Sequence, residues 1–120
     1  LLKGIDMTFD CRLLKNPYWD PTLRMFTGLD PQVGTYIEND ARLAEFRAKV
    51  TDLLVMLLPA FREEGKSHLS IGFGCTGGQH RSVYVAEQVA MALAQQGWQV
   101  SKRHRELDRQ VANAPPTKQT

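Results

Sequence analysis

One stretch of this chain constrains its fold more than any other: a glycine-rich loop, residues 74–82, placed between a strand pattern and a helix pattern. Leu69, Ile71 and Phe73 alternate with small residues, which predicts a strand with one buried face. Apolar residues at spacings of three and four over residues 83–93 then predict a helix with one apolar side. A strand that turns through glycines directly into a helix is typical of α/β domains, where the helix N-terminus is ready to bind an anion.

A first strand and a long helix are expected before this loop. Apolar and polar side chains alternate strictly over residues 5–13, the pattern of a half-buried strand. Asn39 and Asp40 are candidate N-caps of a long helix whose apolar stripe covers residues 43–57. Pro59 is expected to kink or end that helix, because proline lacks the N–H donor and clashes with the preceding turn.

The remaining segments complete a predicted α/β fold. Residues 15–31 are expected to form an irregular loop, and a third short strand is expected over residues 98–101, after Gly97 ends the second helix. The order strand, helix, strand, loop, helix, strand predicts a small, mostly parallel sheet flanked by helices. In such sheets the loops meet at the carboxyl ends of the strands, so we expect a binding crevice there.

Length and composition fit one domain. With 120 residues, 42% of them hydrophobic and 23% charged, the chain can bury a core without a disulfide or a metal. We expect the domain to span residues 1–110 and residues 111–120 to be a disordered tail. Cys11 and Cys75 are interpreted as free thiols, and the longest apolar run, residues 53–58, is far too short to span a bilayer. These features predict a cytoplasmic protein.

Two nucleotide-binding patterns can be tested on the glycine-rich loop. Residues 72–77 spell G-x-G-x-x-G after a strand, the dinucleotide fingerprint, but Lys102 and Arg103 stand where its ribose-binding acid belongs. A Walker loop is excluded, because Gln79 and His80 stand where that motif requires lysine. The chain by itself is therefore not expected to hydrolyse nucleotides.

A third pattern on the loop keeps an enzymatic alternative open. Cys75 and Arg81 form C-x5-R, followed by Ser82, which is the spacing of cysteine-dependent phosphatases. Their loop wraps phosphate with N–H groups, their arginine holds the oxyanion, and a thiolate of lowered pKa attacks phosphorus. Gly74 stands where those enzymes usually carry histidine. A general acid would have to come from one of three aspartates: Asp10, Asp20 or Asp30.

The three patterns share the physics of anion binding. Gly77 and Gly78 let the backbone approach an anion closely, and the helix that follows adds its positive end, worth about 0.3–1 kcal/mol. Arg81 can supply a charge-assisted hydrogen bond worth about 1.5–3 kcal/mol, and Thr76 and Ser82 add hydroxyl groups. The loop is therefore predicted to bind a phosphate-bearing ligand. The alternative is a tight turn with a solvated Arg81.

Four segments of the chain together resemble the C-terminal domain of the RapZ family. They are residues 74–88, 10–19, 24–30 and 103–105, in matching order. They read G-C-T-G-G-Q-H-R-S-V-Y-V-A-E-Q, D-C-R-L-L-K-N-P-Y-W, R-M-F-T-G-L-D and R-H-R. The resemblance extends over nearly the whole chain and is therefore highly specific.

The resemblance implies a regulatory sensor and no enzyme. It implies an α/β domain similar to part of a phosphofructokinase, which binds glucosamine-6-phosphate and a small regulatory RNA. The domain then presents that RNA to the endonuclease RNase E, as an RNase adapter in amino-sugar homeostasis. Full-length relatives carry a separate N-terminal P-loop domain that binds ATP or GTP, so no cofactor is expected here. Relatives also self-associate through this domain, which implies a homo-oligomer.

The candidate ligand site contains no catalytic residue and no metal ligand. Arg81 is expected to be the main counter-charge of the phosphate, while Asp10 and Asn16 read hydroxyl or amino groups of a sugar. Asp10 could instead cap neighbouring N–H groups, and Asn16 could be a turn residue before Pro17. The predicted site comprises ten residues: Asp10, Asn16, Cys75, Thr76, Gly77, Gly78, Gln79, His80, Arg81 and Ser82.

A basic cluster follows the second helix. Its four members are Lys102, Arg103, His104 and Arg105. Basic side chains of this kind could contact RNA phosphates, which give affinity without sequence information, and the family resemblance implies that this cluster contacts RNA. The alternative is a solvated strand edge, where charges prevent pairing with another chain.

Overall fold

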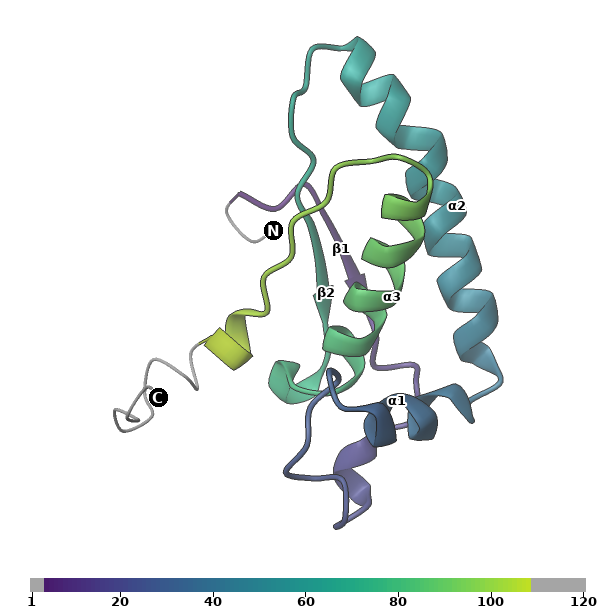
Figure 1. Cartoon of the computed structure of the whole chain (residues 1–120), viewed down its shortest axis with the longest axis vertical. Coiled ribbons are helices and arrows are strands. Elements are labelled where there is room, and N and C mark those ends of the chain that lie inside the picture. The colour runs from purple at the N-terminus through teal and green to yellow at the C-terminus, as the bar shows by residue number, and fades with distance from the viewer. Residues whose placement is uncertain (1–3, 109–120) are drawn as a thin grey trace.

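A two-stranded parallel sheet lies at the centre of the computed structural model, which describes residues 4–108 (Figure 1). Strand β1 (Met7–Asp10) pairs with strand β2 (Ile71–Gly74), so that Phe9 lies opposite Phe73 and Asp10 opposite Gly74. The two strands are far apart in sequence, and the helices between them make the crossover that a parallel pair requires. This pairing confirms the predicted α/β class.

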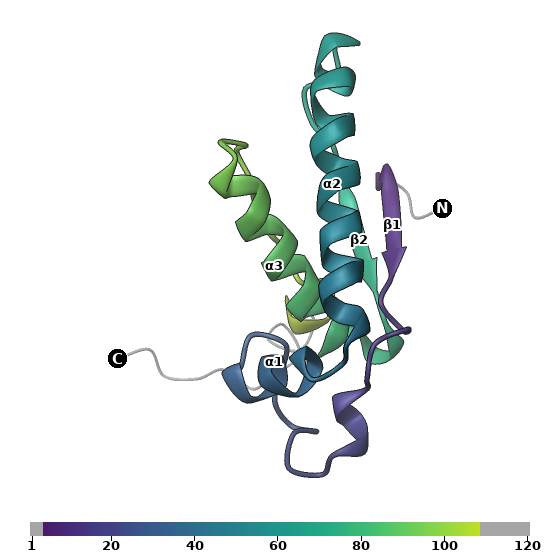
Figure 2. The same ribbon diagram turned by 90° about the vertical axis from the view of Figure 1, so that its right-hand side faces the viewer.

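Within the described residues, three α-helices pack on one face and at one end of the sheet (Figures 1 and 2). Helix α1 (Pro31–Glu38) and the long helix α2 (Arg42–Glu63) form the crossover, and helix α3 (Arg81–Gln95) follows β2. In Figures 1 and 2, α2 and α3 run side by side along the sheet, while α1 lies across the end where both strands finish. Two short 3-10 turns, Pro17–Trp19 and Thr76–Gly78, lie in the loops at that same end.

The core lies between α2, α3 and one face of the sheet. Alternation places Phe9 and Phe73 on this face, with their rings stacked 5.6 Å apart between centroids, while Thr8 and Asp10 point to solvent. The buried side chains of the core come from α1, α2, α3 and the loop after β1, and partly buried side chains of both strands pack against them. Its buried members are Cys11, Leu14, Leu23, Val33, Ile37, Leu43, Val50, Leu54, Val85, Val89 and Leu93.

The predicted third strand is wrong, one of the two alternatives at Pro59 is excluded, and one helix was missed. Among the described residues the sheet has two strands, and residues 98–101 are not a strand: only Trp98 packs on the core, while Val100 is exposed. Pro59 does not end the long helix, which continues to Glu63. Helix α1 was not predicted at all, because it is short and begins with Pro31, whose missing N–H costs nothing in a first turn.

Two further expectations concern the ends of the chain and the membrane. The predicted tail, residues 111–120, and the predicted end of the domain at residue 110 lie outside the described residues. The predicted first strand, residues 5–13, is shorter than expected and covers Met7–Asp10. None of the helices within residues 4–108 combines the length and the apolar character needed to cross a membrane.

Candidate functional site

The glycine-rich loop joins β2 to α3 through a tight, left-handed turn. Cys75 is still extended, and Gly77 and Gly78 follow with φ angles of 79° and 64°. A Cβ on Gly77 would meet no other atom within 4 Å, so its glycine is required by the backbone conformation and not by crowding. The loop therefore exposes backbone to solvent directly before the N-terminus of a 15-residue helix.

The loop lies where the sequence predicted, at the carboxyl ends of both strands. The N–H of Cys11, directly after β1, donates to the carbonyl oxygen of Gly74 at 2.7 Å. Asp10 lies opposite Gly74 in the ladder, so the segments that follow β1 and β2 start side by side. The structure thus brings Asp10 and Cys75, which are far apart in the sequence, to one edge of the sheet.

The Cys75 thiol contacts the first turn of α3. Its Sγ accepts a hydrogen bond from the Ser82 N–H at 3.3 Å and lies 3.2 Å from the Ser82 hydroxyl oxygen. The thiol is half-buried, and the Ser82 side chain is buried beneath it. The Cys75 sulfur therefore lies at the N-terminus of α3, in contact with the first turn of that helix.

Arg81 is buried, and its guanidinium holds the loop that follows β1. Only 4% of the residue is exposed, and Nη1 donates to the carbonyl oxygens of Arg12 and Leu14, each at 3.1 Å. Its Nε is buried without a hydrogen-bond partner among the described residues. The predicted alternative of a solvated Arg81 is therefore wrong. The cation lies under the site and contributes its field and two structural hydrogen bonds.

Asp10 and Asn16 make local contacts. The exposed Asp10 carboxylate accepts hydrogen bonds from the Arg12 side chain and from the Arg12 N–H, and these bonds lower the pKa of Asp10 to about 2, with a smaller contribution from Arg81. Asn16 accepts from the Tyr18 N–H at 3.1 Å and caps the 3-10 turn after it. Both side chains thus occupy the capping and turn roles that the sequence left open as alternatives.

Residues 24–30, which the site prediction omitted, contact the glycine-rich loop and hold it in place. The Gln79 side-chain amide donates to the carbonyl oxygens of Arg24 and Phe26, at 3.1 Å and 2.8 Å. A Cβ on Gly28 would lie 2.4 Å from the carbonyl oxygen of His80, so this position admits only glycine. Residues 24–30 carried part of the family resemblance, but no residue type in them indicated this contact.

His80 is buried in the loop as well, next to Arg81 and Ser82. Only 5% of it is exposed, and burial lowers its pKa, although backbone groups of Phe26, Arg24 and Leu23 partly oppose this effect. The neutral ring therefore predominates at neutral pH. His80 thus contributes to the packing of the loop against residues 24–30.

The basic cluster is divided between two residues anchored to α3 and two exposed arginines. Lys102 and His104 both contact the Glu87 carboxylate of α3, at 3.0 Å and 2.8 Å. The Arg103 side chain is 90% exposed, and Arg105 is exposed as well. Residues 105–108 form a helical turn next to the loop, where a Cβ on Gly78 would lie 3.3 Å from the Cβ of Glu106. The residue that directly follows the basic cluster therefore lies beside the predicted ligand site.

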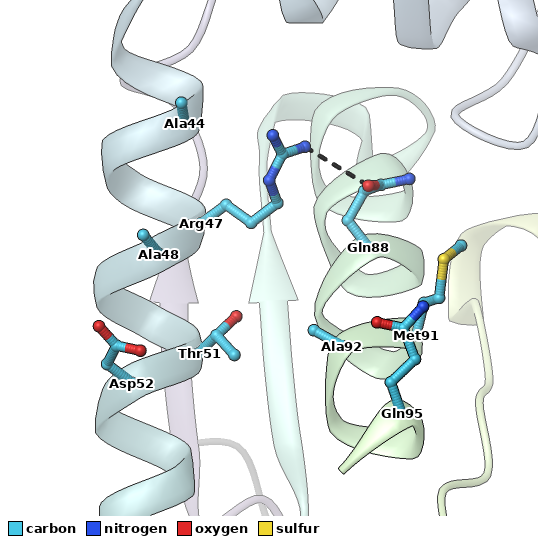
Figure 3. Close-up of a pocket in the computed structure, with 9 residues that line it drawn as sticks. All are labelled: Ala44, Arg47, Ala48, Thr51, Asp52, Gln88, Met91, Ala92 and Gln95. Carbon is cyan, nitrogen blue, oxygen red and sulfur yellow. Dashed lines mark hydrogen bonds between the residues drawn. The ribbon is translucent and has the colours of Figure 1, made fainter.

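Two open grooves lie away from the loop. One, of about 300 Å³, runs between α2 and α3, where Arg47 reaches across to the Gln88 side chain at 3.4 Å (Figure 3). The other, of about 480 Å³, lies between α1 and α3 and is lined by Glu38 and Glu87. Neither groove is lined by residues 74–82. Within residues 4–108 no three His, Cys, Asp or Glu side chains gather as metal ligands would.

The fold and the loop define a small α/β domain with a glycine-rich turn at the carboxyl edge of a parallel sheet, leading into a helix N-terminus. The chain belongs to the family described as the RapZ C-terminal domain, whose family model matches residues 1–108. This match confirms the resemblance drawn from the sequence, and membership of the family supports a regulatory role.

Bacterial relatives support the same assignment. A protein named nucleotide-binding protein from Cereibacter sphaeroides is 60% identical over 98% of this chain, which covers 39% of that relative. Proteins with the same name from Ruegeria pomeroyi and Dinoroseobacter shibae are 59% and 57% identical, over 97% and 93% of this chain and 41% and 37% of the relatives. The chain therefore spans about two fifths of the length of the curated relatives it matches.

Proposed function

We propose that this chain is a regulatory sensing module that binds a sugar phosphate, glucosamine-6-phosphate, on residues 74–82. The observation that carries the proposal is the exposed left-handed turn at Gly77 and Gly78 in front of α3. Free N–H groups of a helix N-terminus and of such a turn bind phosphate oxygens, and the helix dipole adds its positive end. The Thr76 hydroxyl, on the exposed part of the turn, adds a further donor.

Charge at the edge of the site suits an amino-sugar. The Asp10 carboxylate stays ionised, since its pKa is about 2, and it is exposed beside the start of the loop. An ammonium group held near Asp10 would gain a charge-assisted hydrogen bond, while Arg81 beneath the loop attracts the phosphate through its field. This division of roles differs from the sequence prediction, in which Arg81 touched the phosphate directly.

RNA binding is the second part of the proposal. Arg103 and Arg105 are exposed, and the only ion pair of Arg103 among the described residues is a long, exposed one of 4.0 Å with Asp108, whereas Lys102 and His104 are held by Glu87. In this proposal the chain binds a small regulatory RNA and presents it to RNase E as a cytoplasmic adapter that acts as a homo-oligomer. Binding of ATP or GTP would belong to another part of a full-length protein. Family membership supports this role.

Calorimetric titration with glucosamine-6-phosphate tests the ligand. Inorganic phosphate and glucose-6-phosphate are the comparison ligands, and Thr76→Val is the site variant, because it removes one exposed hydroxyl and keeps the shape. Thr8→Val, the same change on the solvent face of β1, is its matched control. We expect the amino-sugar phosphate to bind most tightly, with affinity reduced about tenfold in Thr76→Val, as one hydrogen bond to a charged group is worth roughly 1.5–3 kcal/mol.

Equal affinity for all three ligands would reject the amino-sugar and leave a general phosphate loop. An absence of binding to any of them would reject the sensor. Arg81→Ala is a poor variant for this test, because the buried guanidinium makes two hydrogen bonds that stabilise the fold. Loss of binding in that variant would report on folding as much as on contact with the ligand.

A Cys75-dependent phosphatase is the second candidate, and one contact favours it. The Cys75 sulfur lies at the N-terminus of α3, within hydrogen-bond distance of the Ser82 hydroxyl and N–H, which is the position of a nucleophilic cysteine in such a loop. The position of Arg81 disfavours it, since its guanidinium is held by the carbonyl oxygens of Arg12 and Leu14. Release of phosphate from an aryl phosphate, abolished in Cys75→Ser, would establish the phosphatase. A sensor would bind its ligand without consuming it.

A further inference from the structure

We propose that Cys11 and Cys75 form a reversible disulfide when the chain meets a small aliphatic disulfide such as oxidised glutathione. The pair would be a modification site at the base of the glycine-rich loop. The inference does not depend on the identity of the ligand, because it rests on the position of the two sulfur-bearing residues. Both thiols are free in the structure.

The backbone places the two cysteines side by side. Asp10 lies opposite Gly74, so the next residues of the two parallel strands are Cys11 and Cys75. The Cys11 N–H donates to the Gly74 carbonyl oxygen at 2.7 Å, which is the bond that a parallel ladder makes when Cys11 faces Cys75. Neighbouring strands lie about 4.8 Å apart. That spacing falls within the roughly 4.4–6.8 Å between Cα atoms that a disulfide spans.

The two side chains also share one face of the sheet. Phe9 and Phe73, two residues earlier on each strand, stack their rings on the core side. Side chains alternate with a period of two, so Cys11 and Cys75 point to the same side as these rings. Cys11 belongs to the buried core, and Cys75 packs against that core. A bond between the sulfurs therefore requires side-chain rotation and no change in strand register.

The environments of the two thiols set the order of events. Cys75 lies at the N-terminus of α3, where the Ser82 N–H donates to its sulfur. Because Cys75 is only half-buried, it is the thiol that an external disulfide can reach. Cys11 is fully buried, and burial, with a smaller contribution from Cys75, raises its pKa to about 12. Cys75 is therefore the attacking sulfur, and Cys11 reacts second from a fixed neighbouring position.

The exchange balances in two steps. The Cys75 thiol loses its proton and attacks one sulfur of oxidised glutathione, so that a mixed disulfide forms and one glutathione leaves and takes up a proton. The Cys11 thiol then loses its proton to the second glutathione as its sulfur attacks Cys75. The Cys11–Cys75 bond forms and the mixed disulfide breaks. Two thiols of the chain have given two electrons to one molecule of oxidised glutathione, which becomes two reduced molecules.

The test equilibrates the chain with mixtures of reduced and oxidised glutathione, traps free thiols by alkylation under denaturing conditions, and measures the intact mass. We expect both thiols to disappear together, with a mass lower by two hydrogen atoms and full recovery after a reductant. A peptide digest without reductant should contain one cross-linked pair, Cys11 with Cys75. The transition should shift with the ratio of the two glutathione forms, as an equilibrium does.

Two variants separate the roles of the thiols. Cys11→Ala should stop at the mixed disulfide, so that one glutathione remains on Cys75, and Cys75→Ser should leave Cys11 unreacted. If wild type accumulates glutathione on Cys75 while Cys11 stays alkylatable, or if it forms only cross-links between chains, the inference is wrong. No reaction across the whole range of mixtures would also overturn it. Because the mass measurement needs no ligand, its result is independent of the phosphate titration.

Discussion

Arg81 shows how one residue type can serve two roles that sequence spacing does not distinguish. A cationic residue six positions after a cysteine in a glycine-rich loop predicts a contact with phosphate. In the structure the same guanidinium turns away from solvent and donates to two backbone carbonyl oxygens of the loop after β1. Those acceptors lie nearly seventy residues away in sequence, and no local pattern encodes them. The position of the loop was predictable, but the direction of this side chain was not.

The first prediction concerns the stability that Arg81 provides. Arg81→Met should lower the free energy of unfolding by about 3 kcal/mol, since it removes hydrogen bonds from a charged donor, each worth about 1.5–3 kcal/mol and not fully additive. Urea denaturation measures the change. Arg103→Met, at a side chain that is 90% exposed, is the control and should change stability by less than about 0.5 kcal/mol. Equal stability of the two variants would show that the buried bonds contribute nothing.

The second prediction concerns Asp40, whose side chain is only 8% exposed. Its carboxylate accepts hydrogen bonds from the Arg42 side chain, the Arg42 N–H and the Lys15 N–H, and these bonds outweigh burial and hold its pKa well below the ordinary value. Asp40→Asn should therefore lower the free energy of unfolding by about 1–3 kcal/mol at pH 7.

The pH dependence of this loss has a definite sign. Since the pKa of Asp40 is lower in the folded state, its contribution is complete above the unfolded value of about 3.9 and is lost as the pH falls toward the folded value. The difference between wild type and Asp40→Asn should therefore shrink below about pH 4. Urea titrations at several pH values measure it. A difference that stays constant down to pH 2 would contradict the role of ionisation.

At the scale of elements, α2 shows both the strength and the limit of pattern reading. The apolar stripe correctly predicted a long helix, and Leu43, Val50 and Leu54 are its buried residues. Of the two outcomes expected at Pro59, a kink or an end of the helix, the end is wrong, since α2 continues to Glu63. Helix α1 was missed altogether. Its eight residues carry too short an apolar pattern to be recognised without the core they pack against.

The third prediction uses that proline. Pro59 lies inside α2 and cannot donate the N–H that the turn before it would accept, so Pro59→Ala should raise the free energy of unfolding by about 1–2 kcal/mol. The midpoint of urea unfolding measures this change, and Ala60→Gly in the same turn is the comparison that should be destabilising by about 1 kcal/mol. A destabilised Pro59→Ala would mean that packing of the proline ring outweighs the missing hydrogen bond.

At the scale of the whole molecule, Glu87 connects the end of the described chain to α3. Its carboxylate holds Lys102 and His104, and residues 105–108 then lie against the glycine-rich loop. Desolvation raises the pKa of Glu87, but hydrogen bonds from His104 and Lys102 outweigh this effect and lower the pKa overall. One carboxylate thus fixes the position of the basic cluster relative to the predicted ligand site.

The fourth prediction removes this anchor. Glu87→Gln should increase amide hydrogen exchange over residues 102–108 at least several-fold, because it weakens the contacts with Lys102 and His104 while α3 itself remains folded. Exchange followed by mass spectrometry measures it. Glu45→Gln, which breaks the exposed ion pair with Lys49 within one face of α2, is the matched control and should leave this segment unchanged. Unchanged exchange in Glu87→Gln would show that residues 102–108 are held by other contacts.

Seen across the molecule, the sequence was most informative about the order of elements and least informative about contacts between distant loops. Glycine spacing and alternation located the loop at the carboxyl ends of two parallel strands, as the pairing of Asp10 with Gly74 confirms. The support that Gln79 and Gly28 give from residues 24–30 could not be predicted, because it depends on backbone atoms that any sequence supplies. Patterns of side chains predict which face of a helix or strand is buried. Which backbone carbonyl groups accept hydrogen bonds from distant side chains depends on the complete fold.

The two tryptophans give the molecule two distinct optical reporters. Trp19 is 74% exposed at the end of the sheet where both strands finish, whereas Trp98 packs against the core with the Arg62 guanidinium 4.9 Å from its ring centroid. A water-soluble quencher such as acrylamide would therefore extinguish mainly the red-shifted emission of Trp19 and spare that of Trp98. Ligand binding or structural change near Trp19 and loosening of the core around Trp98 can thus be followed separately in one sample, without any label.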